Sequence, residues 1–241
     1  MNFTPEQKLL RRRILEISHE ARVSHLGSAF SVVDLIAAIY HVKKPDERFV
    51  LSAGHSAAAL YVVLEQHGLL PNPDLHELNV HPDRNPAIGI DVSTGSLGQG
   101  LPIALGIALV DRSKKAWVVT TDGEMAEGSM WEALRIASEQ KLSNLRLFVN
   151  ANGFGAYDRV ETDVLTARIK AFGWRIIPAE GHSPDDLQRA IVEADAVKNI
   201  PAAIIARTTS EQFPFLTGLD AHYYTMKQED FDSAMAALTT V

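Results

Sequence analysis

The second half of the chain alternates short apolar runs with segments of helical periodicity. Four runs rich in β-branched and other apolar residues occur in order along the chain, at 116–120, 145–149, 174–177 and 202–206. Four helical patterns alternate with them, at 98–110, 126–140, 163–172 and 184–197. Strand and helix at this rhythm predict an α/β protein, a three-layer α/β/α domain with a mostly parallel central sheet.

The first third of the chain is less regular. Thr4 is placed to cap a helix that begins at Pro5, and Gln7 completes a capping box with Thr4. We expect this helix to run to about Arg22, and a second, amphipathic helix to open at Ser31. A short apolar run follows at 49–51, and then a helix that should end near 67–68. Residues 71–89 should form a surface loop around a short helix. No repeat or linker interrupts the pattern, so residues 1–241 are expected to form one domain.

Composition narrows the classes of function. The 241 residues are 46% hydrophobic, which is enough for a sizeable core. Lys and Arg number 23 against 30 Asp and Glu, a net charge of −7, and the basic run Arg11 to Arg13 is expected to be a solvated helix face. These features argue against a nucleic-acid or membrane surface. Without cysteine, disulfides, thiolate metal sites and cysteine nucleophiles are excluded. The chain shows neither a signal-peptide pattern nor a membrane span, so we expect a cytoplasmic protein.

Polar residues follow two of the predicted strands. Asp122 and Gly123 come after the first strand, and Asn152 and Gly153 come after the next. Parallel strands end at one edge of a sheet, so Asp122 and Asn152 should lie close together. A carboxylate, an amide oxygen and a turned carbonyl suit a magnesium-type ion. The alternative is that Asp122 only caps a helix and Asn152 only supports a turn, and the residues alone leave both interpretations open.

A glycine-rich loop and three histidines complete the candidate features. The loop at 93–100 reads GxxGxG, which differs from the dinucleotide-binding pattern GxGxxG, and is a weak signal alone. His25, His55 and His81 lie in or beside predicted turns, where histidines are most often ordinary surface residues. No HxxxH spacing occurs, so zinc is not supported.

Taken in chain order, these segments resemble the N-terminal, diphosphate-binding half of a transketolase, from about Glu16 to about Pro201. The family motifs SGHPG, RFVLSxGH, HPE or HPD, GIEVSTGSLGQG and GDGE…EG…WEA…DxN have counterparts at 24–27, 48–55, 81–83, 89–100 and 121–152. The resemblance implies the thiamine diphosphate-binding fold and transfer of a two-carbon ketol unit from a ketose, or its phosphate, to an aldose.

The resemblance also implies site residues. It assigns the divalent ion, Mg²⁺ or else Ca²⁺ or Mn²⁺, to Asp122, the side chain of Asn152 and the main-chain carbonyl of Phe154. It assigns thiamine diphosphate to His55, Gly95, Ser96, Leu97, Asp122, Gly123, Glu124, Asn152 and Ala156, with the Gly123 amide on the diphosphate. Catalysis is assigned to His25, His55, His81 and His222. With pKa values near 6.5, His25, His55 and His81 would pass protons at neutral pH. Glu127 would lie in an interface network between paired active sites.

Three departures from the family pattern stand out. Thr121 replaces the first glycine of GDG, and Asn150 replaces an acidic residue that is not normally a metal ligand, so we expect little effect from either. The segment 207–215 stands where related two-subunit enzymes have a TxKGKG run, and two lysines and two glycines are missing. This loss leaves the substrate open and weakens the assignment of His222.

The resemblance implies a missing partner as well. In the family, the glutamate that activates the cofactor lies in a second, pyrimidine-binding domain, as do most residues that grip a sugar phosphate. We therefore expect a separately encoded C-terminal subunit with that glutamate, joined as an α2β2 heterotetramer. Two alternatives remain: a subunit of another thiamine diphosphate enzyme, similar to deoxyxylulose-phosphate synthase or a 2-oxo acid dehydrogenase, and a non-catalytic homologue.

Overall fold

The computed structural model describes residues 2–155 and 158–239 and contains five parallel strands in the order β1-β2-β3-β5-β4. The strands are β1 (Arg48–Leu51), β2 (Ala116–Thr121), β3 (Leu145–Ala151), β4 (Arg175–Glu180) and β5 (Ala202–Arg207). The longer helices are α1 (Pro5–Ala21), α2 (Leu26–Val42), α3 (Ala57–Gln66), α5 (Gly100–Val110), α6 (Gly128–Glu139), α7 (Thr162–Ala171), α8 (Pro184–Ala196) and α9 (Gln228–Thr239). Short helices are η1 (Gly54–Ser56), α4 (Leu75–Leu78), η2 (Pro86–Ile88), η3 (Gly123–Ala126) and η4 (Gly218–His222).

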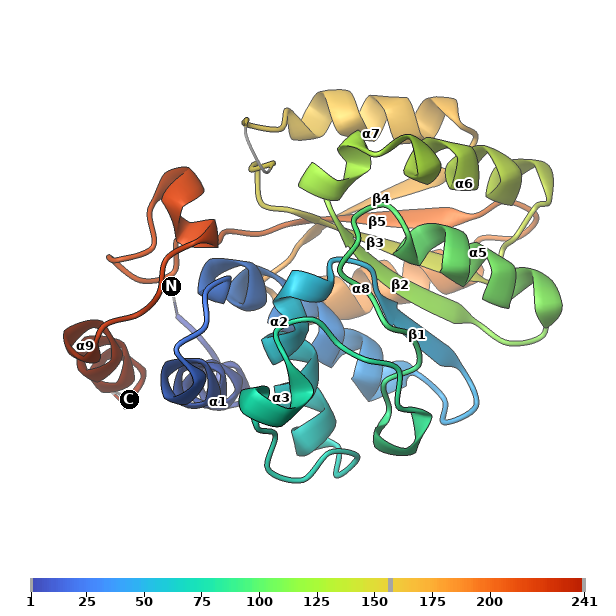
Figure 1. Cartoon of the computed structure of the whole chain (residues 1–241). Coiled ribbons are helices and arrows are strands. Elements are labelled where there is room, and N and C mark those ends of the chain that lie inside the picture. The colour runs from blue at the N-terminus through green and yellow to red at the C-terminus, as the bar shows by residue number, and fades with distance from the viewer. Residues whose placement is uncertain (1, 156–157, 240–241) are drawn as a thin grey trace.

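The sheet is covered on both faces, which confirms the three-layer prediction. Successive side chains of a strand point to opposite faces, and along β2 Trp117 and Val119 join one apolar cluster while Val118 joins the other. Helices α2 and α8 cover the first face, with α1 and α3 packed against α2, and α5, α6 and α7 cover the second (Figure 1). The central strands β2 and β3 are buried on both sides, as a parallel sheet between helices requires, while the edge strand β4 is partly exposed.

Local signals in the sequence explain several helix ends. The Thr4 hydroxyl accepts the Gln7 N–H and the Gln7 side chain accepts the Thr4 N–H, so the predicted capping box is confirmed. Ser183 likewise caps α8 by accepting the Asp186 N–H. No helix in the described ranges has both the length and the apolar composition needed to cross a bilayer.

The prediction for α2 was wrong in its start and in its character. The helix begins at Leu26, five residues before Ser31, and most of its residues are buried, so it is not amphipathic. Its N-cap is His25, which has a left-handed φ of 66° and makes no side-chain capping bond, so no capping motif marked the start. Ser31 lies inside the helix, where its hydroxyl donates to the Ser28 carbonyl.

Two other expectations also differ from the structure. Arg11 is fully buried, so a solvated face is the wrong interpretation for the first residue of the basic run. Its neighbour Arg13 is partly exposed and pairs with Glu16 and Glu65. The last helix predicted from the sequence is the one that starts after Ser183, whereas the structure adds α9, which packs beside α1 (Figure 1).

Candidate functional site

Two loops meet at the carboxyl edge of the sheet. Thr121 of β2 pairs with Asn150 of β3, so the residues that follow these strands leave the sheet side by side. Asp122 Oδ2 accepts the Gly153 N–H at 2.7 Å, which confirms the predicted proximity of the two loops. Asp122 Oδ1 accepts the Gly123 N–H at 3.0 Å. The Gly123 amide, which the resemblance assigns to a diphosphate, is therefore held by the neighbouring carboxylate in this structure.

Asp122 is a buried carboxylate held by backbone N–H groups. Its exposed fraction is 2%. Burial raises its pKa to about 7, and the backbone hydrogen bonds from Gly153 and Gly123 lower it without outweighing burial. A carboxylate in this setting gains from a cation supplied from outside the chain, because burial disfavours its charge.

Asn152 and Phe154 provide two more oxygens on the loop that contacts Asp122. Asn152 Oδ1 accepts the Phe154 N–H at 3.0 Å, so Asn152 does support a turn, and its amide oxygen keeps a second lone pair for a ligand. A Cβ atom on Gly123 would lie 3.1 Å from the Phe154 carbonyl oxygen and 2.8 Å from Gly155 Cα, so only glycine fits there. One carboxylate, one amide oxygen and one carbonyl thus come from adjacent loops, a donor set that fits a hard divalent ion.

Within residues 2–155 and 158–239, no group of three or more His, Asp or Glu side chains could hold a metal. The proposed ligand set contains only one such side chain and is of a different kind.

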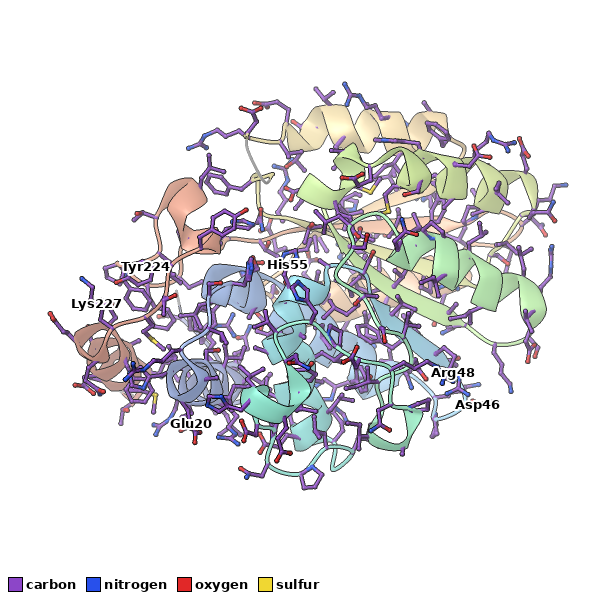
Figure 2. All side chains as sticks on the ribbon, viewed as in Figure 1. Glu20, Asp46, Arg48, His55, Tyr224 and Lys227 are labelled. Carbon is purple, nitrogen blue, oxygen red and sulfur yellow. The ribbon has the colours of Figure 1, made fainter. Side chains whose placement is uncertain are left out.

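Four histidines from separate segments converge beside this edge. The His25 and His55 rings lie 5.2 Å apart, and the His55 and His222 rings 6.3 Å apart, measured between centroids. Figure 2 shows His55 between the starts of α2 and α3. His81 lies against Gly95, where a Cβ atom would come within 2.6 Å of His81 Cδ2 and φ is +142°. The four histidines line one cavity of about 170 Å³ together with Gly95, Leu97, Thr121, Gly123, Glu124, Phe154, Gly155 and Tyr223.

The expected pKa values near 6.5 are wrong for His25 and His55. Burial, together with the nearby His222 and His81, lowers the pKa of His25 to about 4. Burial, with His25 next in importance, lowers the pKa of His55 to about 3. Burial also lowers the pKa of His222. At neutral pH His25 and His55 are therefore neutral, each with one donor and one acceptor nitrogen.

Glu124 has a structural position at the site. It is fully buried, and its Oε1 accepts from the Ser52 hydroxyl at 2.6 Å and from the Gly98 N–H at 2.8 Å. Its own N–H donates to the Thr121 hydroxyl. Glu124 therefore ties the glycine-rich loop to the ends of β1 and β2, and its assignment to the cofactor stays a prediction.

Three buried polar atoms at the cavity have no hydrogen-bond partner within the described residues. They are His25 Nδ1, His222 Nδ1 and Glu124 Oε2. Buried polar atoms are normally paired, so unpaired atoms around one cavity point to a polar ligand or water that fills it.

A larger cavity of about 600 Å³ adjoins the first. Both are lined by Leu97, Gly123 and Gly155, so the site continues toward α6 and α7. Glu127, Trp131 and Asp122 line the larger cavity, and Glu127 is exposed.

The remaining predicted site residues have mixed outcomes. Ser96 is exposed and does not line either of these cavities, and Ala156 lies outside the described residues. Tyr223 was missed: its ring lies 5.8 Å from that of His25, and its only sequence signal was its place after His222.

Comparison with known proteins identifies the family. Residues 10–238 match the family model described as the thiamine diphosphate binding domain of transketolase. The chain belongs to the transketolase family. It is 35% identical over 225 residues to the transketolase of Pongo abelii, an alignment that covers 83% of this chain and 36% of that protein. The chain thus spans about a third of that relative, and the match favours a transketolase over the synthase-like alternative.

Two further comparisons concern the length of the chain and its fold. The 6-deoxy-6-sulfo-D-fructose transketolase subunit SqwG of Clostridium sp. (strain MSTE9) is 30% identical, over 97% of this chain and 94% of its own. The crystal structure of a transketolase from Campylobacter jejuni superposes with a TM-score of 0.83 at 23% identity, over 99% of this chain and 43% of that one. The second likeness shows the shared fold.

Proposed function

We propose that this chain is the thiamine diphosphate-binding subunit of a two-subunit transketolase. With its partner it would transfer a two-carbon ketol unit from a ketose, or its phosphate, to an aldose. The observation that carries the proposal is the pattern of coverage: the chain matches a third of a full-length transketolase but nearly the whole of the Clostridium transketolase subunit. On this proposal, residues 1–241 form a single diphosphate-binding domain in the cytoplasm.

The residues present fit the cofactor and its metal. Asp122, the Asn152 side chain and the Phe154 carbonyl would hold Mg²⁺, and the cation would replace the proton that burial keeps on Asp122. The unpaired atoms of His25, His222 and Glu124 leave polar partners for a ligand in the cavity. Bound thiamine diphosphate would supply the carbanion chemistry, while the protein supplies binding, orientation and charge.

The histidines would bind the sugar and handle its protons. Because His25 and His55 are neutral at pH 7, each offers one acceptor nitrogen to a sugar hydroxyl, and a proton taken up there would be returned readily, since both pKa values lie well below 7. His81 and His222 face the same cavity and would orient further hydroxyls.

A partner would complete the site. The cavity of about 600 Å³ that opens past Leu97 to Glu127 and Trp131 offers the face on which a pyrimidine-binding subunit would dock. That subunit would bring the activating glutamate, and the family pattern favours an α2β2 assembly.

Reconstitution tests this proposal. The chain is purified alone and with the product of a candidate reading frame that encodes a pyrimidine-binding domain, and ketol transfer is measured for both. We expect activity only in the pair, and turnover reduced about 100-fold or more by His25→Ala or His81→Ala. His41→Ala is the matched control, because His41 pairs with Glu6 outside the cavity, and it should leave turnover unchanged. Activity of the chain without any partner would overturn the two-subunit proposal.

A further inference from the structure

The segment that follows β5 and runs through η4 contains the stretch that differs most from the family pattern, and it leads directly to the cavity. It starts at Thr208 and ends at His222, whose ring faces His55. The lysines and glycines expected here are absent, and Ser210 and Phe213 of this segment are buried. Some other set of contacts must therefore hold this segment in place.

A buried charged cluster lies beside the start of this segment. We call Arg11, Asp34 and His182 the Asp34 cluster. The Arg11 guanidinium donates to both oxygens of Asp34, at 3.0 and 2.7 Å, and His182 Nδ1 lies 2.7 Å from Asp34 Oδ2. The side chains of Arg11 and Asp34 are 0% and 3% exposed. A bidentate pair of this kind fixes direction as well as distance.

The cluster contacts the segment at two points. His182 Nε2 accepts the Thr209 N–H at 3.0 Å, so this nitrogen carries no proton and the ring hydrogen is on Nδ1, where it donates to Asp34. Arg11 Nε donates to Gln212 Oε1 at 2.8 Å. The Gln212 amide nitrogen in turn donates to the Phe30 carbonyl at 2.9 Å, inside α2.

The far end of the segment is held against His25. The His25 N–H donates to the His222 carbonyl at 3.0 Å. A Cβ atom on Gly27 would come within 3.2 Å of the Ala221 carbonyl oxygen, so this end packs closely on the start of α2. A shift of the segment at Gln212 would therefore be passed on to His222.

We propose that the Asp34 cluster, acting through Thr209 and Gln212, positions His222 in the cavity and replaces the missing lysine and glycine anchor. Arg11, Asp34, His182 and Gln212 are positioning residues, since the cavity described above does not include them. The catalytic consequence rests on the proposed transketolase function, whereas the placement of His222 does not.

A pair of variants at Gln212 tests the inference on the full-length chain. Gln212→Met keeps the length of the side chain but removes its polar contacts, which include those of the amide nitrogen with the Thr209 carbonyl at 3.1 Å and with His182 Nε2 at 3.4 Å. Gln212→Glu keeps an acceptor for Arg11 and should restore part of the effect. Neither variant changes the charged cluster itself, so both are expected to fold.

Hydrogen exchange and imidazole NMR are the structural measurements. In Gln212→Met we expect the amides of residues 209–222, and that of His25, to exchange about tenfold faster, as the loss of one or two hydrogen bonds allows. The His222 imidazole signals should also shift in Gln212→Met. In Gln212→Glu, the exchange rates and the His222 signals should lie between those of the original protein and those of Gln212→Met. Exchange at 216–222 and His222 signals identical to those of the original protein would overturn the inference.

Enzymatic measurements and a control separate positioning from loss of stability. In the complex with its partner, Gln212→Met should lower kcat about tenfold while the Kd for thiamine diphosphate with Mg²⁺ changes less than about twofold. Asp195→Asn is the control, because Asp195 pairs with the buried Arg146 at the amino end of β3. It should lower stability without moving His222, and an equal change in His222 would refute a specific role for Gln212. If the chain shows no ketol transfer with any candidate partner subunit, the proposed function fails. The hydrogen-exchange and NMR data would still decide whether Gln212 positions His222.

Discussion

Asp34 and Asp122 are two almost equally buried aspartates with opposite properties. They are 4% and 2% exposed. Burial raises the pKa of both, but at Asp34 the hydrogen bonds from His182 and Arg11 outweigh burial and lower the pKa to about 2. At Asp122 the partners are backbone N–H groups, burial prevails, and the pKa rises to about 7.

The two aspartates differ in whether the chain itself supplies a cation for the buried carboxylate. Asp34 finds its counter-charge, Arg11, and a hydrogen-bond donor, His182, inside the chain, and its cluster serves the fold and the segment leading to His222. Asp122 has no such partner among the contacts that hold it, and it lies at the carboxyl edge where ligands of open parallel sheets bind. A buried carboxylate without an internal cation is what a metal site is expected to contain before the metal binds.

The largest expected effect is the loss of the charge at Asp34. Asp34→Asn leaves the fully buried Arg11 without its counter-ion, and we expect a loss of about 3 to 5 kcal/mol in the free energy of unfolding. Urea denaturation at pH 7 measures it. Glu132→Gln, in an exposed pair with Arg135, is the control and should change stability little. A loss of less than about 1 kcal/mol in the free energy of unfolding of Asp34→Asn would show that Asp34 is not the required counter-ion of Arg11.

The same substitution at Asp122 should have the opposite sign in metal-free protein. A folded pKa of about 7, above the unfolded value of 3.8, means that the folded state keeps its proton longer, so the contribution of Asp122 to stability falls as pH rises from about 4 through 7. Asp122→Asn should therefore be more stable than the original protein at pH 8, by about 4 kcal/mol, since the pKa of Asp122 rises from 3.8 to about 7 and each pKa unit corresponds to about 1.4 kcal/mol. The gain should shrink toward pH 4.

Urea denaturation at both pH values, with EDTA present, checks this prediction. Asp34 should behave in reverse, since its depressed pKa makes its contribution complete above pH 4 and lost as pH falls toward 2. An Asp122→Asn variant less stable than the original protein at pH 8 would show that the carboxylate is already compensated within the chain.

Adding ligand should stabilise the protein through Asp122 but not through Asp34. With thiamine diphosphate and Mg²⁺ at about 100 times their Kd, the original protein should gain about 2.7 kcal/mol. Asp122→Asn should show almost none of this gain, because the cation loses its only carboxylate ligand. Asp34→Asn, corrected for its lower starting stability, should keep it, and thermal unfolding with and without ligand measures all three proteins. Equal gains in all three would place the cofactor elsewhere.

The smallest effect concerns the histidines near Asp122. His25 and His55, with pKa values of about 4 and about 3, should show no imidazole titration by NMR between pH 5.5 and 8. The same residues in urea-unfolded protein should titrate near 6.5. Because the unfolded chain binds these protons at higher pH, this pair makes stability rise with pH between about 4 and 6.5. A midpoint above 6 in the folded protein would contradict their burial.

Periodic features of the sequence predicted the layers of the fold. The apolar runs became β2 to β5, because burial on both faces leaves a simple pattern. The start of α2 was not predictable from capping motifs, because His25 caps it by backbone geometry alone. Arg11 could not be recognised as buried, because its counter-ion Asp34 and the His182 ring that also contacts Asp34 are 23 and 171 residues away from it in the chain.

The candidate site followed from topology, and its electrostatics did not. The adjacency of Asp122 and Asn152 was predicted from two strand ends and is confirmed by the bond from Gly153 to Asp122. The depressed pKa of His25 depends on burial and on other histidines brought together from distant segments. The roles assigned to the metal ligands and to the histidines remain predictions.

Calorimetric titration of thiamine diphosphate tests the central claim most directly. The original protein, Asp122→Asn and the exposed control Asp111→Asn are titrated with and without Mg²⁺. We predict binding that requires Mg²⁺ in the original protein and in Asp111→Asn, and a Kd at least about 100-fold weaker in Asp122→Asn, a difference of about 2.7 kcal/mol. The same Kd in all three proteins, or binding that is indifferent to Mg²⁺, would contradict the account.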